Sequence, residues 1–161
     1  MDSRRRKTSR KESLNSGIYL LEIYARKKFA IEIKKFNDRF FLAGYYYYVG
    51  SAQKNLRQRI MRHLRKDKIA HWHIDHITTN PATLIKNLFL IKSGKKDLEC
   101  EIANLLENNI NLDASLKGFG NSDSNCSSTH LFYSKKKIDH NHLLSLYQSM
   151  VRLIPSEIET I

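Results

Sequence analysis

Two short segments that each join a glycine to a tyrosine constrain the fold of this chain more than any other feature. The first, Gly17-Ile18-Tyr19, opens a run rich in Ile, Leu and Tyr, and the second, Tyr48-Val49-Gly50, closes an aromatic-dense run. Both runs have the composition of β-strands. Arg59 and His63 follow four residues apart on a predicted helix, so they neighbour each other on its surface. The sequence thus predicts two strands and a helix that carry two tyrosines, an arginine and a histidine.

The hydrophobic pattern along the chain predicts a small α+β domain. Runs of β-branched and aromatic residues predict strands over residues 17–24, 29–35, 40–50, 82–91 and 131–134. Apolar residues at helical spacing predict helices over residues 55–66, 97–109 and 139–154. We expect the first three strands to form an antiparallel meander within a small antiparallel or mixed sheet that is flanked by helices.

Local signals predict how several of these elements begin and end. Asn55 is expected to cap the first helix, with Gln58 completing a capping box. Asp97 is expected to cap the second helix, and Pro155 to end the third. The His-rich segment 71–77 lies between elements, and its alternating apolar residues favour a half-buried strand.

Charge and cysteine content narrow the classes of partner and compartment. The chain of 161 residues has 28 Lys and Arg against 16 Asp and Glu, a net charge of +12. Such an excess favours a polyanion, nucleic acid before an anionic membrane surface. Residues 1–13 are basic and nearly free of apolar residues, so we expect a disordered tail before one domain over residues 14–161. The two cysteines form no secreted framework, and we expect a reducing cytoplasm and no membrane span.

The predicted helix places Arg59 and His63 beside its apolar stripe of Leu56, Ile60 and Leu64, at the edge where helix meets sheet. An arginine at such an edge can hold a phosphate and stabilise its developing charge. A neutral histidine there can accept a proton. The alternative is structural, with Arg59 paired to a local carboxylate and His63 packed as a half-buried ring.

The stretch from Tyr48 to Arg59, together with Gly17-Ile18-Tyr19, resembles the GIY-YIG nuclease superfamily. It is especially similar to the N-terminal nuclease domain of the bacterial excision-repair incision subunit. The resemblance implies a small α/β fold with a three-stranded antiparallel sheet. It also implies cleavage of phosphodiesters with one divalent metal ion per site, Mg²⁺ or Mn²⁺.

A closer resemblance covers residues 16–134. It is to a prokaryotic, largely archaeal branch of that superfamily, some members of which are fused to endonuclease III-like glycosylases. It rests on six stretches: residues 44–52, 62–64, 71–75, 99–100, 118–123 and 130–133. This branch implies a role in DNA repair and a base-excision repair protein as a possible partner. Ser124 departs from the branch, which usually has a cysteine there ahead of Cys126.

The superfamily resemblance assigns roles to individual residues. Tyr19 and Tyr48 match the two motif tyrosines, which position or deprotonate the attacking water and orient the scissile phosphate. Arg59 matches the arginine that stabilises the pentavalent phosphate. His63 stands where relatives carry Tyr or His and would assist as a base or a phosphate ligand. The metal ligand of the family is a glutamate on a later helix.

Two glutamates of the helix over residues 97–109 compete for the metal. By helical arithmetic Glu99 lies about 40° from the mean apolar direction and Glu101 about 120°. Glu99 therefore faces the sheet edge while Glu101 faces water, and we expect Glu99 to bind the metal. A single carboxylate with several waters suits Mg²⁺. The alternative for Glu99 is an ordinary acidic residue near a helix N-terminus.

Other residues give weaker hypotheses. The residues that we expect to contact nucleic acid are Arg57, Arg62, Arg65, Lys66, His71 and His73. A zinc site built from His71, His73 and Asp75 with Cys126 or His130 matches no standard zinc spacing. Residues 118–120 could cradle a phosphate through backbone N–H groups, although such Gly-x-Gly loops are more often turns.

The sequence therefore predicts a metal-dependent DNA endonuclease of GIY-YIG type. The alternative is a non-catalytic nucleic-acid-binding module that keeps the nuclease fold.

Overall fold

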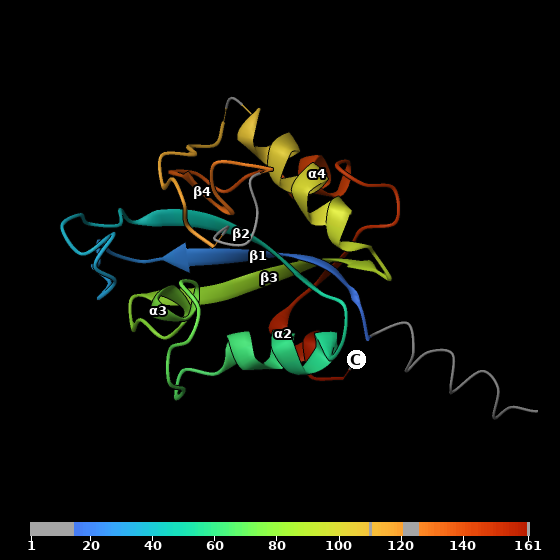
Figure 1. Ribbon diagram of the computed structural model, residues 1–161, viewed down its shortest axis with the longest axis horizontal. Coiled ribbons are helices and arrows are strands. Elements are labelled where there is room, and N and C mark those ends of the chain that lie inside the picture. The colour runs from blue at the N-terminus through green and yellow to red at the C-terminus, as the bar shows by residue number, and fades with distance from the viewer. Residues whose placement is uncertain (1–14, 110, 121–125, 161) are drawn as a thin grey trace, which may run out of the picture.

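A five-stranded antiparallel sheet forms the centre of the molecule, confirming the α+β class (Figure 1). The computed structural model describes residues 15–109, 111–120 and 126–160. The strands are β1 (Gly17–Ala25), β2 (Gly44–Ala52), β3 (Thr83–Lys92), β4 (Leu131–Ser134) and β5 (Val151–Leu153). They lie in the order β4-β2-β1-β3-β5, and each pairs antiparallel with its neighbours. The basic tail expected over residues 1–13 lies outside the described residues.

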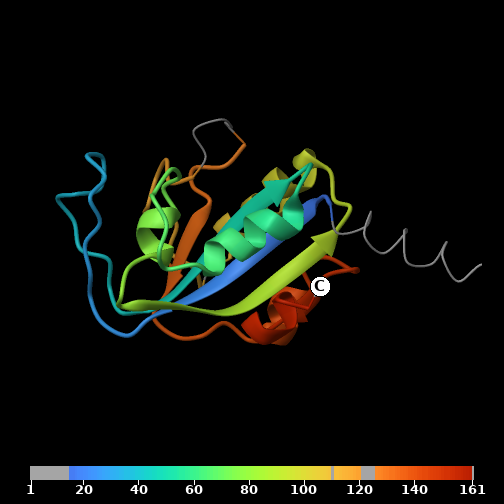
Figure 2. The same ribbon diagram turned by 90° about the horizontal axis from the view of Figure 1, so that it is seen from below.

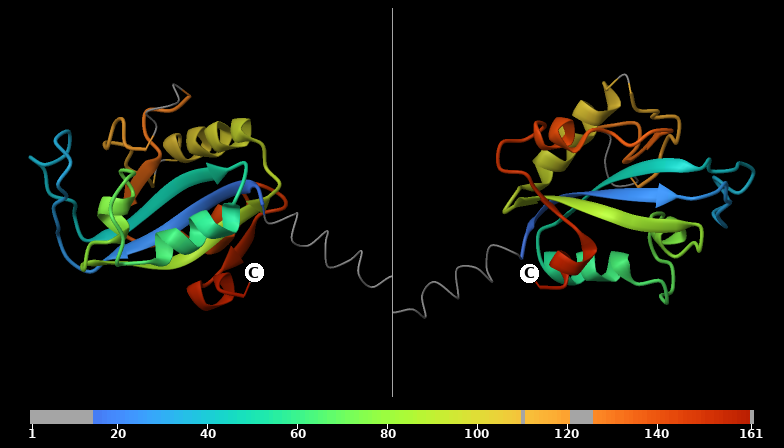
Figure 3. Two further views of the ribbon diagram at one scale, coloured as in Figure 1. Left: turned by 60° about the horizontal axis from the view of Figure 1, so that its bottom comes forward. Right: turned by 180° about the vertical axis from the view of Figure 1, so that it is seen from behind.

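Helices cover both faces of the sheet, and each face has its own core (Figures 1 and 3). One core joins the sheet to α2 (Leu56–Leu64), α3 (Asp75–Thr78) and α6 (Pro155–Ile158). The other joins it to α4 (Lys96–Glu107) and α5 (His140–Leu144). Because side chains alternate along a strand, Tyr19 of β1 belongs to the α2 face whereas Leu20 belongs to the α4 face.

The strand predicted over residues 29–35 does not form, so the expected three-stranded meander is wrong. Strand β1 pairs directly with β2 on one side and with β3 on the other. Residues 26–43 instead extend beyond the end of the sheet (Figure 2), closed by a single bridge between Phe29 and Phe41. The alternating pattern arose because Phe29, Ile31 and Phe36 anchor this segment in the core. Strand β2 accordingly begins at Gly44 and not at Phe40, which is 65% exposed.

The helix predicted over residues 139–154 is also wrong. Asp139 does cap α5 by accepting from the backbone N–H of Asn141, but the helix ends at Leu144. Residues 151–153 form β5 along the free edge of β3. The supposed apolar stripe is discontinuous, since Ile154 is 40% exposed. Pro155 begins α6, where its missing N–H costs nothing.

The predicted helix caps and the 71–77 strand differ from the structure as well. Asn55 precedes α2 with φ 57° and makes no side-chain capping bond, so the capping box is absent. Helix α4 begins one residue before Asp97, with Lys95 at its N-cap position. The segment that starts at His71 turns directly into α3, because backbone hydrogen bonds from residues 75 and 76 close tight turns there.

The two cysteines, which we expected to lie in a reducing compartment, are paired with each other. Cys100 of α4 and Cys126 of the segment before β4 form a disulfide, with their Cα atoms 5.5 Å apart. The bond ties α4 to the chain that leads into β4. Among the described residues, no helix has the length and apolar character needed to span a bilayer.

Candidate active site

The pairing of β1 with β2 places both motif tyrosines on the α2 face of the sheet. In the register of this pair Tyr19 lies opposite Gly50, and Leu21 lies opposite Tyr48. Both tyrosines are largely buried, at 2% and 9% exposure. The sheet therefore provides a rigid base from which the two hydroxyl groups project toward α2.

The glycines of the two motifs are required by close contacts. A Cβ atom on Gly50 would lie 2.4 Å from Cζ of Tyr19, inside van der Waals contact. A Cβ atom on Gly17 would lie 2.5 Å from the carbonyl oxygen of Ile91 on β3. Gly50 thus makes room for the Tyr19 ring, while Gly17 lets β3 approach β1.

Helix α2 packs Leu56 and Ile60 into this face and so directs Arg59 and His63 toward the tyrosines. The Tyr19 hydroxyl oxygen lies 2.8 Å from Nε2 of His63, a buried hydrogen bond. Arg59 donates through Nη1 to the carbonyl oxygen of Ser51 at 2.6 Å. The structural alternatives do not describe these two residues fully, because Arg59 binds a carbonyl and not a carboxylate. His63 is fully buried and hydrogen-bonded to Tyr19, not a half-buried ring.

Glu99 approaches the same place from the first turn of α4, and Glu101 does not. Its Oε2 accepts from the Ser51 hydroxyl at 2.5 Å, and its Oε1 lies 3.2 Å from Nδ1 of His130. The side chain of Glu99 is 13% exposed, whereas Glu101 is exposed on the outer side of the helix. The orientation predicted from helical arithmetic is confirmed for both residues.

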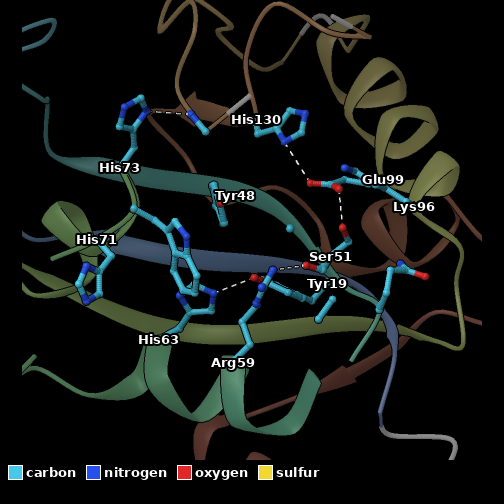
Figure 4. Close-up of a pocket in the computed structure, with 15 residues that line it drawn as sticks. Tyr19, Tyr48, Ser51, Arg59, His63, His71, His73, Lys96, Glu99 and His130 are labelled. Carbon is cyan, nitrogen blue, oxygen red and sulfur yellow. Dashed lines mark hydrogen bonds and ion pairs between the residues drawn. The ribbon is translucent and has the colours of Figure 1, made fainter. Parts of the chain in front are cut away.

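All five predicted catalytic residues line one cavity of about 410 Å³ (Figure 4). They are Tyr19, Tyr48, Arg59, His63 and Glu99. Four different elements contribute them, and Glu99 is the one carboxylate among the described residues that line the cavity.

Burial dominates the ionisation of the tyrosines and of His63. Burial raises the pKa of Tyr19 well above its usual value, and the nearby Tyr48 adds to this effect. Burial raises the pKa of Tyr48 in the same way, helped by Glu99. Burial, helped by the positive charge of Lys68, lowers the pKa of His63 to about 3. At neutral pH the Tyr19–His63 pair is therefore uncharged.

Glu99 supplies the negative charge of the cavity. Burial alone would raise the pKa of this carboxyl, but the contacts from His130 and Ser51 outweigh burial, so the pKa falls below its usual value. Glu99 is thus ionised at neutral pH. An ionised carboxylate that faces an open cavity, with water for its other ligands, is the donor set that Mg²⁺ accepts. The residues present therefore fit one divalent cation.

The six residues predicted to contact nucleic acid are not equivalent. His71 and His73 line the cavity, and Arg65 is exposed, with Asp67 at 3.8 Å. The other three donate hydrogen bonds to groups of the protein itself. Arg57 donates to the carbonyl of Glu159, and Arg62 donates to the carboxylate of Asp75. Lys66 donates to the carbonyls of Asn80 and Thr83.

Two of the weaker hypotheses find no support. The part of the chain that is described contains no cluster of three or more His, Cys, Asp or Glu side chains able to hold a metal, and Cys126 is in the disulfide. The 118–120 loop does not offer a cradle, since its N–H groups bond to Ser128, Leu116 and the His73 ring.

Among the other residues that line the cavity, sequence reasoning did not expect Ser51, Trp72 and Lys96 there, and it considered His130 only as a zinc ligand. Ser51 follows Gly50 in the second motif, so its position was available from the strand. Trp72 and His130 could not be placed, because both come from irregular segments whose paths depend on tertiary contacts. His130 is 2% exposed, and its Nε2 atom is buried without a hydrogen-bond partner among the described residues.

Residues 18–152 match the family described as "Domain of unknown function DUF123". Because the match covers most of the chain, the protein belongs to this family. No curated protein and no solved structure matches the chain.

Proposed function

We propose that this DUF123 protein is a divalent-metal-dependent DNA endonuclease of the GIY-YIG type. The observation that carries the proposal is the convergence of Tyr19, Tyr48, Arg59, His63 and Glu99 on one cavity. The resemblance to the GIY-YIG superfamily predicts their roles, helical position separates Glu99 from Glu101, and the five residues are spread over 81 positions of the chain. If each of the five residues had only a structural role, nothing would require all of them to line the same cavity.

Tyr19 and His63 would together position the attacking water. In the proposed reaction Tyr19 donates its hydroxyl proton to Nε2 of the neutral His63, and its oxygen, which also receives Arg59, has a second lone pair that can accept from water. As the water attacks phosphorus, its proton would pass to Tyr19 while the Tyr19 proton moves onto His63, and the negative charge of the bound phosphate would raise the proton affinity of this buried ring. Tyr48, on the neighbouring strand, would orient the phosphate or the same water.

Arg59 would bind the phosphate that is attacked. One guanidinium nitrogen is held by the carbonyl of Ser51, which fixes the side chain in the cavity and leaves other N–H groups to face a ligand. Preorganised donors of this kind stabilise the charge that develops on phosphoryl oxygens. Lys96, exposed on the cavity wall, would add positive charge.

Glu99 would hold the metal ion. When bound, a divalent cation acts as a Lewis acid on a phosphoryl oxygen and stabilises the leaving oxygen. Ser51 and His130 would keep the Glu99 carboxylate ionised and directed toward the cavity.

The net charge of +12 supports nucleic acid as the substrate. The resemblance to a branch with fused glycosylases suggests DNA repair as the context, with a base-excision repair protein as a partner.

Nicking of supercoiled plasmid tests the proposal. The purified protein should nick plasmid and cut branched substrates with Mg²⁺ or Mn²⁺, and excess EDTA should stop it. Glu99→Gln should lower the rate by at least about 100-fold. Glu101→Gln removes the same charge from the exposed side of the same helix and should leave the rate unchanged.

Two results would contradict the nuclease assignment. One is tight nucleic-acid binding with no cleavage of any substrate, which would identify a binding module that keeps the fold. The other is equal nicking by wild type and Glu99→Gln, which would point to a contaminating enzyme.

A further inference from the structure

Trp72 is an exposed aromatic residue on the wall of the cavity, and the proposed reaction leaves it without a role. It lines the same cavity as Tyr19 and Arg59, and 42% of its surface is exposed. A tryptophan that remains this exposed beside a polar cavity gives up a large hydrophobic contribution to folding. Such a residue is therefore a candidate for contact with a ligand.

A buried carboxylate holds the backbone of Trp72 in place. Asp75 is fully buried, and its Oδ2 accepts from the backbone N–H groups of Trp72 at 3.0 Å and His71 at 2.9 Å. Nη1 of Arg62 lies 2.8 Å from both oxygens of the same carboxylate, and Lys68 lies within 3.7 Å. The turn that carries Trp72 is thus tied to α2 by a dense ionic network.

The Trp72 ring is also oriented by α2. The guanidinium carbons of Arg59 and Arg62 lie 4.9 Å and 4.8 Å from the ring centroid, within cation–π range. The His63 ring is tilted against it at 6.2 Å. These three contacts all come from one helix and hold the ring, while 42% of the residue remains exposed to solvent. A fixed, open aromatic surface loses little entropy when a ligand stacks on it.

The proposed function sets the chemistry that this surface would meet. Arg59 contacts the Trp72 ring and is also the residue assigned to the phosphate. A nucleotide whose phosphate is held by Arg59 therefore has its base within reach of the indole. In an uninterrupted duplex both faces of that base are covered by its neighbours, whereas an unpaired or extruded base has a free face. The cavity of about 410 Å³ is large enough to take in a single nucleotide.

We propose that Trp72 is a stacking platform for one unstacked nucleobase next to the scissile phosphate. This inference rests on the proposed nuclease function and names its substrate class: nucleic acid with an unpaired or flipped-out base at the cut site, as in single strands, flaps and bulges. Uninterrupted duplex is a poor substrate because the base must first be extruded.

Intrinsic fluorescence tests the platform directly, because Trp72 is the only tryptophan in the chain. The full-length protein is titrated in EDTA with a short DNA strand, and with a strand of equal length and charge that carries abasic spacers at its centre. Binding is followed in parallel by anisotropy of a label on the DNA. We expect strong quenching by the strand with bases, and weak quenching by the abasic strand and by blunt duplex. Equal quenching by all three at equal saturation, or none by any, overturns the proposal.

Cleavage provides the second measurement. Trp72→Ala should raise KM for an unpaired substrate about tenfold, as expected for the loss of one stacked base, and Trp72→Phe should restore most of the loss. Tyr147→Ala removes another exposed aromatic residue that does not line the cavity, and it should change nothing. Circular dichroism of Trp72→Phe and Trp72→Ala checks that both fold.

The two proposals fail in different ways. If wild type cuts DNA while Trp72→Ala keeps the same KM and the same preference for unpaired bases, the platform is refuted and the nuclease stands. If bases quench Trp72 but no variant and no wild-type preparation cuts any substrate, the platform stands and the nuclease is refuted.

Discussion

His63 combines two properties that ordinarily conflict, because it is the hydrogen-bond partner of the tyrosine that we propose to be catalytic and yet is sealed from water. It is 1% exposed, its Nε2 contacts Tyr19, and its Nδ1 is buried with no partner among the described residues. A neutral ring tolerates this environment and an imidazolium does not. The same burial that fixes the hydrogen bond to Tyr19 therefore makes the folded state sensitive to acid.

We predict that His63 makes the protein lose stability between about pH 6.5 and pH 3. The unfolded chain binds a proton at His63 with a pKa near 6.5, whereas the folded chain binds it only near pH 3. Below pH 6.5 the unfolded state thus holds more protons than the folded state. The free energy of unfolding therefore falls as the pH is lowered, by up to about 4 kcal/mol. Denaturant titrations between pH 7.5 and pH 3.5 should show a shallower fall for His63→Gln. The exposed His142→Gln should keep the wild-type profile; identical slopes for all three proteins would contradict the prediction.

The five residues of the candidate site could be found from the sequence because each belongs to a regular element. Tyr19 and Tyr48 follow from strand motifs, while helical periodicity separates Glu99 from Glu101. Trp72 could not be found in this way, because its position depends on the hydrogen bonds from residues 71 and 72 to the buried Asp75. Tertiary contacts of this kind leave no periodic signal in the chain.

The conformation of the segment between α2 and α3 is held by hydrogen bonds and ion pairs to Asp75. The carboxylate is 0% exposed and receives Arg62, Lys68 and two backbone N–H groups. Burial alone would raise its pKa, but these partners outweigh burial and lower it. Removing the charge would leave Arg62 and Lys68 facing each other without their shared counterion.

We predict that Asp75→Asn lowers the free energy of unfolding by about 3–5 kcal/mol, because it breaks a buried ionic network from one side. Urea denaturation at pH 7 measures the effect. Asp67 provides the control, because its side chain is 91% exposed. Asp67→Asn should change the free energy of unfolding by less than about 0.5 kcal/mol. Equal effects of the two substitutions would show that the Asp75 network is not important for the fold.

The elements that were predicted wrongly share one cause. Residues 29–35 alternate like a strand and residues 139–154 carry an apolar stripe like a helix, yet neither forms as expected. In both segments the apolar residues are explained by burial of isolated side chains, such as Phe36 and Met150. Strand pairing then determines which segments join the sheet. The free edge of β3 pairs with β5, whereas β1 is paired on both sides and cannot accept another strand.

The molecule as a whole should bind nucleic acid in a strongly salt-dependent way. Its net charge is +12, and Arg59 of α2 and Lys96 of α4 line the cavity. Each phosphate contact releases condensed counterions, so the affinity falls as salt rises.

We predict that the slope of log K against log salt is clearly negative and that Arg59→Ala makes it shallower by about 0.7–0.9, the contribution of one phosphate contact. Anisotropy titrations from 50 to 300 mM KCl measure both slopes. Lys86→Gln removes an exposed charge on β3 that does not line the cavity, and it provides the control. An affinity that stays constant over this range would exclude nucleic acid as the partner.

The candidate site is assembled from parts of the chain that are made at very different times. Tyr19 lies on β1, which pairs with β2 and with β3, and β3 ends at Lys92. Glu99 and His130, which also line the cavity, follow later in the chain. A growing chain on the ribosome therefore has no cavity until most of its length has emerged and folded. Truncated or proteolysed copies that lack the region after β3 keep the tyrosines but have no acidic residue to complete the site. Under the proposed function, incomplete synthesis would therefore yield fragments that cannot bind the metal ion at this site and do not cut DNA.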